Sequence, residues 1–127
     1  MNRDDARLLL VDDSASMRGT IRNLLRDLGF PRIDEAADGN EAFSLFQKHP
    51  YDVVITDWYM PRFTGIELLR AIRTGLQRQA TPVLVLTGSV SRGCLREAIA
   101  AGANGFVPKP FVTPSLGNQM SHLMAVE

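Results

Sequence analysis

The sequence lacks several features that would at once assign it to a class of proteins. Cys94 is the single cysteine, which excludes an intrachain disulfide and cannot by itself form a metal cluster. No apolar run approaches the length of a membrane span, and the start, Met1-Asn2-Arg3, does not have the pattern of a signal peptide. We therefore expect a reduced, cytoplasmic protein that has no membrane partner.

Net charge is also absent, because 14 basic residues balance 14 acidic ones. This balance argues against a dedicated nucleic-acid binder, whose composition would be basic. The sequence has no internal repeat, no low-complexity segment and no linker long enough to separate two domains. Its 127 residues suit one hydrophobic core, so we expect a single domain over residues 1–127.

What the sequence does contain is a regular alternation of short expected strands with segments in which apolar residues recur at helical spacing. The alternation occurs five times, which is typical of an α/β fold with a doubly wound parallel sheet and helices on both faces. The third run is apolar and β-branched throughout, as a strand buried on both faces requires. The expected strands are Leu8–Val11, Arg32–Ala36, Val53–Ile55, Val83–Leu86 and Gly105–Val107.

Two local expectations complete this outline. Asp38-Gly39 has the composition of a turn between the second expected strand and the helix after it. In the fourth helix, Leu95, Ala98 and Ile99 recur at helical spacing and are expected to face the core.

Polar residues that could bind a metal ion or a phosphoryl group follow four of the expected strands. Asp12 and Asp13 follow the first, Asp57 the third and Thr87 the fourth, and Lys109 comes shortly after the fifth. Since the carboxyl ends of parallel strands meet at one edge of the sheet, where ligands bind, we expect these side chains to converge. Taken singly, each has an ordinary explanation as a turn, a helix cap or an exposed loop, but their shared position favours a common site.

The expected site combines anions that repel one another with groups that bind phosphate. A hard divalent cation relieves the repulsion, and Mg²⁺ prefers oxygen ligands and keeps several waters. The carboxylates and one backbone carbonyl, such as that of Tyr59, leave room for water and a phosphoryl oxygen. The Lys109 ammonium can contact a phosphoryl group as a point charge, and the Thr87 hydroxyl can donate to it. We therefore expect Mg²⁺ as the cofactor, with Mn²⁺ as a possible substitute.

Together these residues resemble the receiver domain of two-component response regulators. The resemblance covers the chain from Leu8 to about Met124, and the spacing looks closest to the single-domain chemotaxis response regulators. It implies a flavodoxin-like sheet with strand order 2-1-3-4-5. The motifs that carry it are Leu10-Val11-Asp12-Asp13-Ser14, Asp57 with Met60-Pro61, Thr87-Gly88, Gly102-Ala103-Asn104-Gly105 and Lys109-Pro110-Phe111.

The resemblance implies a role for each acid. Asp57 is implied to be the phosphoacceptor, which takes a phosphoryl group from a histidine kinase or a histidine phosphotransfer protein. Asp13, Asp57 and the Tyr59 carbonyl are implied to bind Mg²⁺ directly, and Asp12 largely through water. Such a domain catalyses only its own phosphorylation and dephosphorylation, so we expect no enzyme that acts on an outside substrate.

The resemblance also implies how the phosphoryl group is sensed. Thr87 and Lys109 are implied to contact it, and Phe106 to turn inward behind Thr87. The surface of the fourth helix, fifth strand and fifth helix is implied to bind a downstream protein, with the chain as a monomer. Tyr59 and Ser89 stand at two rim positions that tune hydrolysis within the family.

The first helix carries an arginine row, Arg18, Arg22 and Arg26, at intervals of four residues. Such a row is either a solvated face or, as in the family that the chain resembles, a docking face for the phosphotransfer partner.

Other classes were weighed against the same residues. A phosphatase of the haloacid dehalogenase type needs Asp-x-Asp, and Asp57-Trp58-Tyr59 does not supply it. A flavodoxin-like cofactor binder needs a Ser-, Thr- or Gly-rich phosphate loop, whereas Asp12-Asp13-Ser14 has the opposite charge. Two alternatives stay open: a pseudo-receiver that is never phosphorylated, and a receiver fragment of a larger regulator or hybrid kinase. We expect no output domain after the fifth helix.

Overall fold

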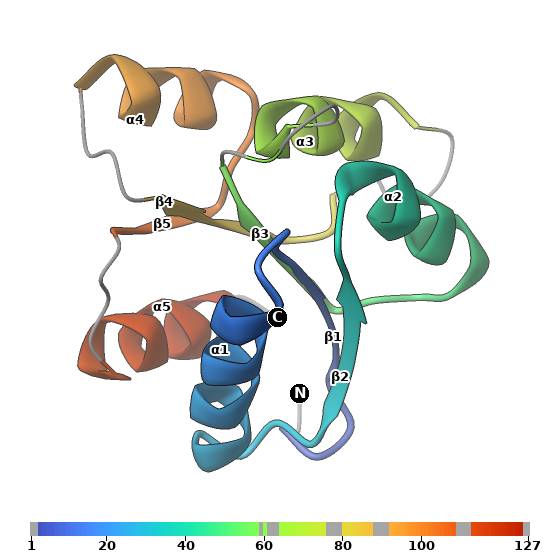
Figure 1. Cartoon of the computed structure of the whole chain (residues 1–127). Helices are drawn as coiled ribbons and strands as arrows, with labels where there is room; N and C mark the ends of the chain where they lie inside the picture. The colour runs from blue at the N-terminus through green and yellow to red at the C-terminus, as the bar shows by residue number, and fades with distance from the viewer. Residues whose placement is uncertain are drawn as a thin grey trace.

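The computed structural model describes residues 3–58, 60, 64–75, 80–87, 92–108 and 113–125, in which five strands and five helices alternate (Figure 1). The strands are β1 Arg7–Val11, β2 Arg32–Ala36, β3 Val53–Asp57, β4 Val83–Thr87 and β5 Gly105–Pro108. The helices are α1 Ala15–Asp27, α2 Gly39–Lys48, α3 Gly65–Thr74, α4 Arg92–Ala100 and α5 Thr113–Ala125.

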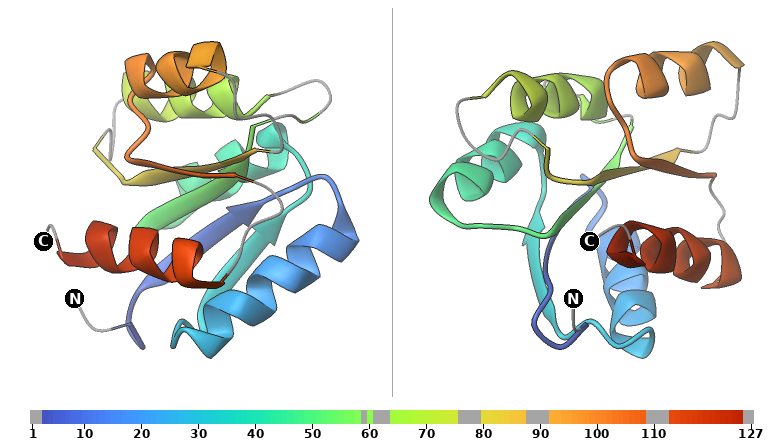
Figure 2. Two further views of the ribbon diagram at one scale, coloured as in Figure 1. Left: turned by 90° about the vertical axis from the view of Figure 1, so that its left-hand side faces the viewer. Right: turned by 180° about the vertical axis from the view of Figure 1, so that it is seen from behind.

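The five strands form one parallel sheet in the order β2-β1-β3-β4-β5, as the resemblance implied. Helices α1 and α5 cover one face, and α2, α3 and α4 cover the other (Figure 2). Because both faces are covered, the apolar runs of the central strands are buried along their whole length. The prediction of a single doubly wound α/β domain is therefore confirmed.

Alternation along β1 shows how one strand serves two cores. Leu8 and Leu10 belong to the cluster under α1 and α5, whereas Leu9 and Val11 belong to the cluster under α2, α3 and α4. All four side chains are fully buried. The strand is thus fixed from both sides, which gives a rigid base to whatever follows its carboxyl end.

Side-chain caps determine where the helices begin. The Ser14 hydroxyl accepts a hydrogen bond from the backbone N–H of Met17 at the start of α1. The Asp38 carboxylate accepts one from the N–H of Glu41 at 2.8 Å. Asp38-Gly39, expected as a turn, is therefore the cap and first residue of α2. A carboxylate at this position satisfies a helical N–H that would otherwise lack a partner, which stabilises a helix by about 1 kcal/mol.

The expectation for Ile99 is wrong, because its side chain is 63% exposed. Among the α4 side chains that the structure describes, that of its neighbour Ala98 is fully buried and belongs to the core. One residue turns a helix by about 100°, so a helix at the edge of the sheet buries only a narrow stripe. The side chain of Leu95 lies outside the described residues.

In the part of the chain that the structure describes, no helix has the length and hydropathy that a bilayer span requires.

Candidate functional site

Asp57 is the last residue of β3, which continues two residues beyond the expected end. Its side chain is only 7% exposed. The strand end is held by two hydrogen bonds: the Trp58 N–H donates to the Leu86 carbonyl at 2.8 Å, and the Thr56 hydroxyl donates to the Asp57 carbonyl at 3.0 Å. A carboxylate is therefore fixed at the carboxyl edge of the sheet, on its central strand.

Asp12 and Asp13 leave β1 at the same edge but in different environments. Asp12 is 1% exposed, and its N–H donates to the Ala36 carbonyl at 3.1 Å. Its carboxylate accepts the Ser14 N–H at 2.9 Å, which shapes the turn into α1. Asp13 is exposed. One acid of the pair is thus built into the turn, and the other opens to solvent.

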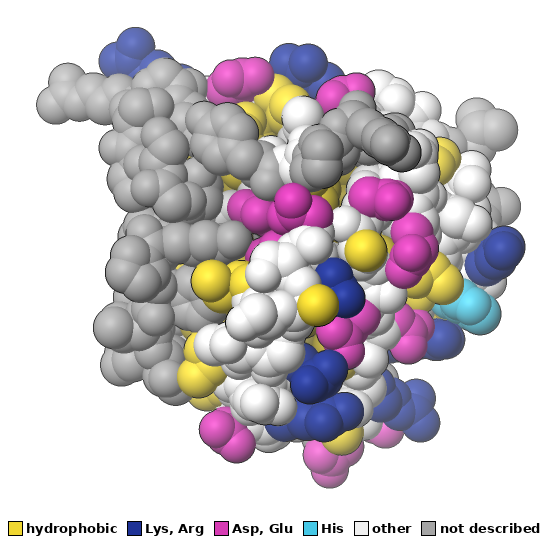
Figure 3. Space-filling model, viewed as in Figure 1, with side chains coloured by type: hydrophobic (Ala, Val, Ile, Leu, Met, Phe, Trp, Pro, Cys, Tyr) yellow, Lys and Arg dark blue, Asp and Glu magenta, His cyan; other side chains and the backbone are white. Residues whose placement is uncertain are grey.

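The three carboxylates converge, as expected from their positions after the strands. One oxygen from each of Asp12, Asp13 and Asp57 lies within 4.8 Å of the other two. Figure 3 shows acidic side chains gathered near the centre of the view, above the position of α1. Unit charges about 5 Å apart near a protein surface repel by roughly 3 kcal/mol per pair, so this cluster favours a cation.

The donor set fits a hard divalent ion. Carboxylate oxygens are the ligands of Mg²⁺, which also retains water molecules, and an exposed Asp13 leaves one side of the cluster accessible to them. Three carboxylates from two adjacent strands suit this ion better than the thiolate and imidazole sets typical of zinc.

Several residues predicted for the site cannot be compared with the structure. Tyr59, Ser89 and Lys109 lie outside the described residues, as does the side chain of Thr87. The backbone of β4 does end at Thr87, opposite Pro108 of β5 and at the same edge as Asp57. The structure therefore brings the three acids together and leaves the expected contacts of the other residues as predictions.

The arginine row on α1 is not simply a solvated face. Arg18 Nη1 donates to the Asp12 carbonyl at 2.7 Å, and its Nε to Glu35 Oε1 at 3.3 Å. Arg22 Nη1 donates to the other oxygen of Glu35 at 2.8 Å. Of these three arginines, only Arg26 is exposed, while Arg18 and Arg22 are half-buried. Sequence analysis missed this network because Glu35 meets α1 only through the pairing of β2 with β1.

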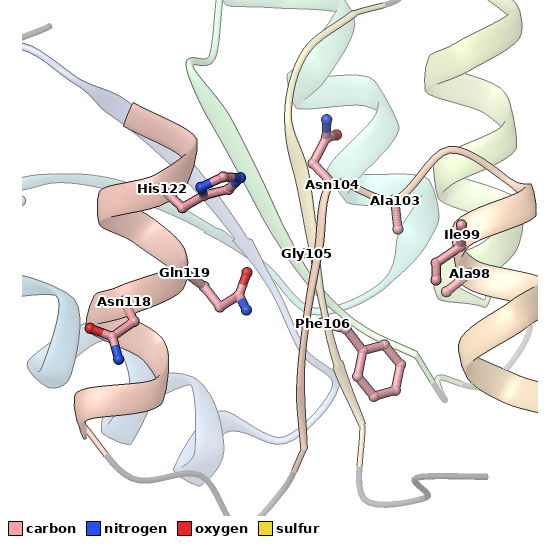
Figure 4. Close-up of a pocket in the computed structure, with 9 residues that line it drawn as sticks. All are labelled: Ala98, Ile99, Ala103, Asn104, Gly105, Phe106, Asn118, Gln119 and His122. Atoms are coloured by element: carbon pink, nitrogen blue, oxygen red, sulfur yellow. The ribbon is translucent and has the colours of Figure 1, made fainter. Parts of the chain in front are cut away.

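Phe106 lies on the side of β5 that faces α4, and Asn118, Gln119 and His122 of α5 lie on the other side (Figure 4). Its ring is half-buried and packs against the core under α4. A cavity of about 440 Å³ opens along this edge strand. Its described lining residues carry no fixed charge: Ala98, Ile99, Ala103, Asn104, Gly105, Phe106, Asn118, Gln119 and His122.

Comparison with known proteins gives a consistent result. The family described as the response regulator receiver domain matches residues 8–120. The chain is 43% identical to the chemotaxis protein CheY of Pseudomonas aeruginosa over 117 residues, which cover 92% of this chain and 94% of that protein. It is 41% identical to the chemotaxis protein CheY-3 of Vibrio cholerae, over 92% of this chain and 90% of that one.

Solved structures agree with the sequence comparison. The chemotaxis protein CheY4 of Vibrio cholerae matches with a TM-score of 0.86 and 39% identity, over 93% of this chain and 98% of that one. The receiver domain of a sensor histidine kinase from Pseudomonas aeruginosa matches with a TM-score of 0.86 and 28% identity, over 94% of this chain and 98% of that one. That structure has a magnesium ion coordinated in its active site cleft.

Proposed function

The chain belongs to the response regulator receiver domain family, and we infer that it is a signalling switch controlled by phosphorylation of Asp57. Receiver domains are signalling proteins. The observation that carries the inference is the convergence of Asp12, Asp13 and Asp57, whose carboxylate oxygens lie within 4.8 Å of one another. Within this trio Asp57 ends the central strand, while the other two acids leave β1. The chain would then promote its own phosphorylation and the later hydrolysis of its aspartyl phosphate, and it would act on no outside substrate.

The proposed metal is Mg²⁺, with Mn²⁺ as a substitute, held by Asp12, Asp13, Asp57 and the Tyr59 carbonyl. The magnesium ion in the related Pseudomonas receiver domain supports this assignment. When bound, the ion supplies positive charge that lets an anionic phosphoryl group approach a carboxylate. The chain's acids supply the ligands, and the burial of Asp12 and Asp57 limits competition from bulk water.

In the proposed transfer, a carboxylate oxygen of Asp57 attacks the phosphorus of a phosphohistidine. The new P–O bond forms as the P–N bond breaks, and the electron pair of that bond stays on the imidazole nitrogen, which takes up a proton. Positioning and charge stabilisation carry most of the catalysis in such reactions. The Lys109 ammonium and the Thr87 hydroxyl are proposed to contact the transferred group, and Tyr59 and Ser89 to set its lifetime.

The proposed readout is a shift in the surface formed by α4, β5 and α5, which binds a downstream protein. Thr87 ends β4 opposite Pro108 of β5, and Phe106, two residues earlier on β5, pairs with Val85 of β4. This surface would exist in an inactive and an active arrangement. Phosphorylation would shift the equilibrium between them only as far as the phosphoryl group interacts more favourably with the active arrangement.

Phosphotransfer profiling tests the proposal. Histidine kinases and histidine phosphotransfer proteins carrying labelled phosphate are mixed with the wild-type chain in Mg²⁺, and with Asp57→Asn as the matched control. We expect rapid transfer from a cognate donor to the wild type and none to the variant. A chain that accepts label from no donor, small phosphodonors included, would be a pseudo-receiver, and the proposal would be wrong.

A further inference from the structure

Arg18 of α1 reaches back across the start of its own helix to the acidic turn. Its Nη1 donates to the backbone carbonyl of Asp12 at 2.7 Å, and its side chain is 19% exposed. That carbonyl belongs to the peptide bond joining Asp12 to Asp13. A guanidinium therefore holds the bond that orients both acids of β1.

The other end of this contact is anchored in the sheet. Arg18 Nε donates to Glu35 Oε1 at 3.3 Å, and Glu35 lies opposite Leu10 in the pairing of β2 with β1. Arg22 fixes the second oxygen of Glu35 at 2.8 Å. Figure 3 shows basic and acidic side chains interspersed where α1 and β2 adjoin. The planar guanidinium of Arg18 thus connects a strand to the acidic turn in a fixed geometry.

We propose that Arg18 is a positioning residue for the metal site, which acts through the Asp12–Asp13 peptide and touches neither the metal nor the phosphoryl group. This inference rests on the proposed function, because it assigns a task within the same site. Groups that hold metal ligands in place strongly affect metal affinity without binding the metal.

Arg22 supplies a matched control. It presents the same guanidinium to the same Glu35 from one turn further along α1, whereas the hydrogen bond to the Asp12 carbonyl comes from Arg18. Arg18→Gln and Arg22→Gln therefore remove the same charge and one bond to Glu35 each. Only Arg18→Gln also removes the bond to the acidic turn.

The experiment is a titration of the full chain with Mg²⁺, followed by the fluorescence of Trp58, which directly follows Asp57. We expect Arg18→Gln to bind Mg²⁺ about tenfold more weakly than wild type, and Arg22→Gln to bind close to the wild-type affinity. Arg18→Lys keeps the charge and one donor, so it should recover part of the loss. Equal affinities of Arg18→Gln and Arg22→Gln would overturn the proposal.

A second measurement separates this inference from the proposed function. The Ser14 amide donates to Asp12 at 2.9 Å, and without added Mg²⁺ its hydrogen exchange should be faster in Arg18→Gln than in Arg22→Gln. Unchanged exchange would contradict the positioning role. Asp13→Ala should abolish the Mg²⁺ response of the wild type. If the wild type shows no response to abolish, the proposed function fails, while the exchange data still judge the role of Arg18.

Discussion

Gly65, the first residue of α3, has no room for a side chain beside β3. A Cβ there would lie 2.3 Å from the Asp57 carbonyl oxygen and 2.9 Å from the Trp58 Cα, both of them backbone atoms. Gly65→Ala should therefore push the helix start away from Asp57 and lower the free energy of unfolding by roughly 1–3 kcal/mol, as overpacked sites do. Urea unfolding measures the loss.

Gly19→Ala is the control for this substitution. Its Cβ would meet only the flexible end of Arg22, at 3.5 Å, inside α1. Alanine is preferred over glycine in a helix interior by about 1 kcal/mol, so this variant should be as stable as wild type or more stable. If Gly65→Ala matched Gly19→Ala in stability, the close approach of α3 to Asp57 would be wrong.

Residues differ in how well the sequence alone predicts them. Asp12, Asp13 and Asp57 are predictable because each follows an apolar run, and parallel strands end at one edge. The contacts of Arg18 are not, because they depend on the pairing that brings Glu35 of β2 beside α1. Ile99 was mispredicted because periodicity does not tell how wide a buried stripe is at the edge of a sheet.

Among the structural elements, β1 and β2 are tied to the start of β3 through Tyr51. Its hydroxyl donates to Asp34 at 2.7 Å, and Arg7 donates to the same carboxylate oxygen at 3.2 Å while lying 5.4 Å from the ring centroid. Burial of the phenol and then its hydrogen bond to Asp34 raise the pKa of Tyr51 well above its ordinary value. The neutral phenol is thus part of the folded state.

This shift predicts how stability changes in alkaline solution. The pKa of Tyr51 is higher in the folded than in the unfolded chain. The contribution of the neutral phenol to the free energy of unfolding is therefore fully present below about pH 10 and is lost as the pH rises beyond that value. The free energy of unfolding should fall more steeply above pH 10 in the wild type than in Tyr51→Phe. Urea unfolding at a series of pH values measures both slopes, and parallel curves would contradict the prediction.

The presence of each strand and helix can be predicted from the local sequence, but the residues at which they end are predicted less well. All five strands were predicted from the sequence, but β3 and β4 extend to Asp57 and Thr87, which are polar residues that hydropathy assigns to loops. Hydrogen bonds between elements far apart in the sequence were not predicted either. Arg73 of α3 donates to the Gly102 carbonyl at 2.8 Å and to the Thr81 carbonyl at 2.7 Å, and only the folded chain brings these groups together.

Across the whole molecule, the proposed switch requires that a change at Asp57 on β3 reach α4 and β5. Phe106 is proposed to lie on that route; it is half-buried against the core under α4, and it has no hydroxyl that could bond to a partner. Phe106→Ala should therefore weaken the coupling, whereas Phe106→Tyr should be tolerated. The measurement is hydrogen exchange of α4 with and without beryllofluoride, which stands in for the phosphoryl group. If Phe106→Ala keeps the full change, Phe106 is ordinary packing.

The strand order of the whole sheet shows a further limit of sequence patterns. Alternating strands and helices predicted a parallel sheet, but several orders satisfy that alternation. The order 2-1-3-4-5 came from the resemblance, and the structure confirms it. Because β1 and β3 are adjacent in this order, their carboxyl ends bring Asp12 and Asp57 together.

The assignment of Asp57 as phosphoacceptor is tested most directly by chemical mapping of the modified residue. The chain is incubated with Mg²⁺ and acetyl phosphate, reduced with borohydride, which converts an aspartyl phosphate to homoserine, and digested for mass spectrometry. We predict homoserine at position 57 alone, and none in Asp57→Asn or when Mg²⁺ is removed. Homoserine at another aspartate, or none in the wild type, would contradict the assignment.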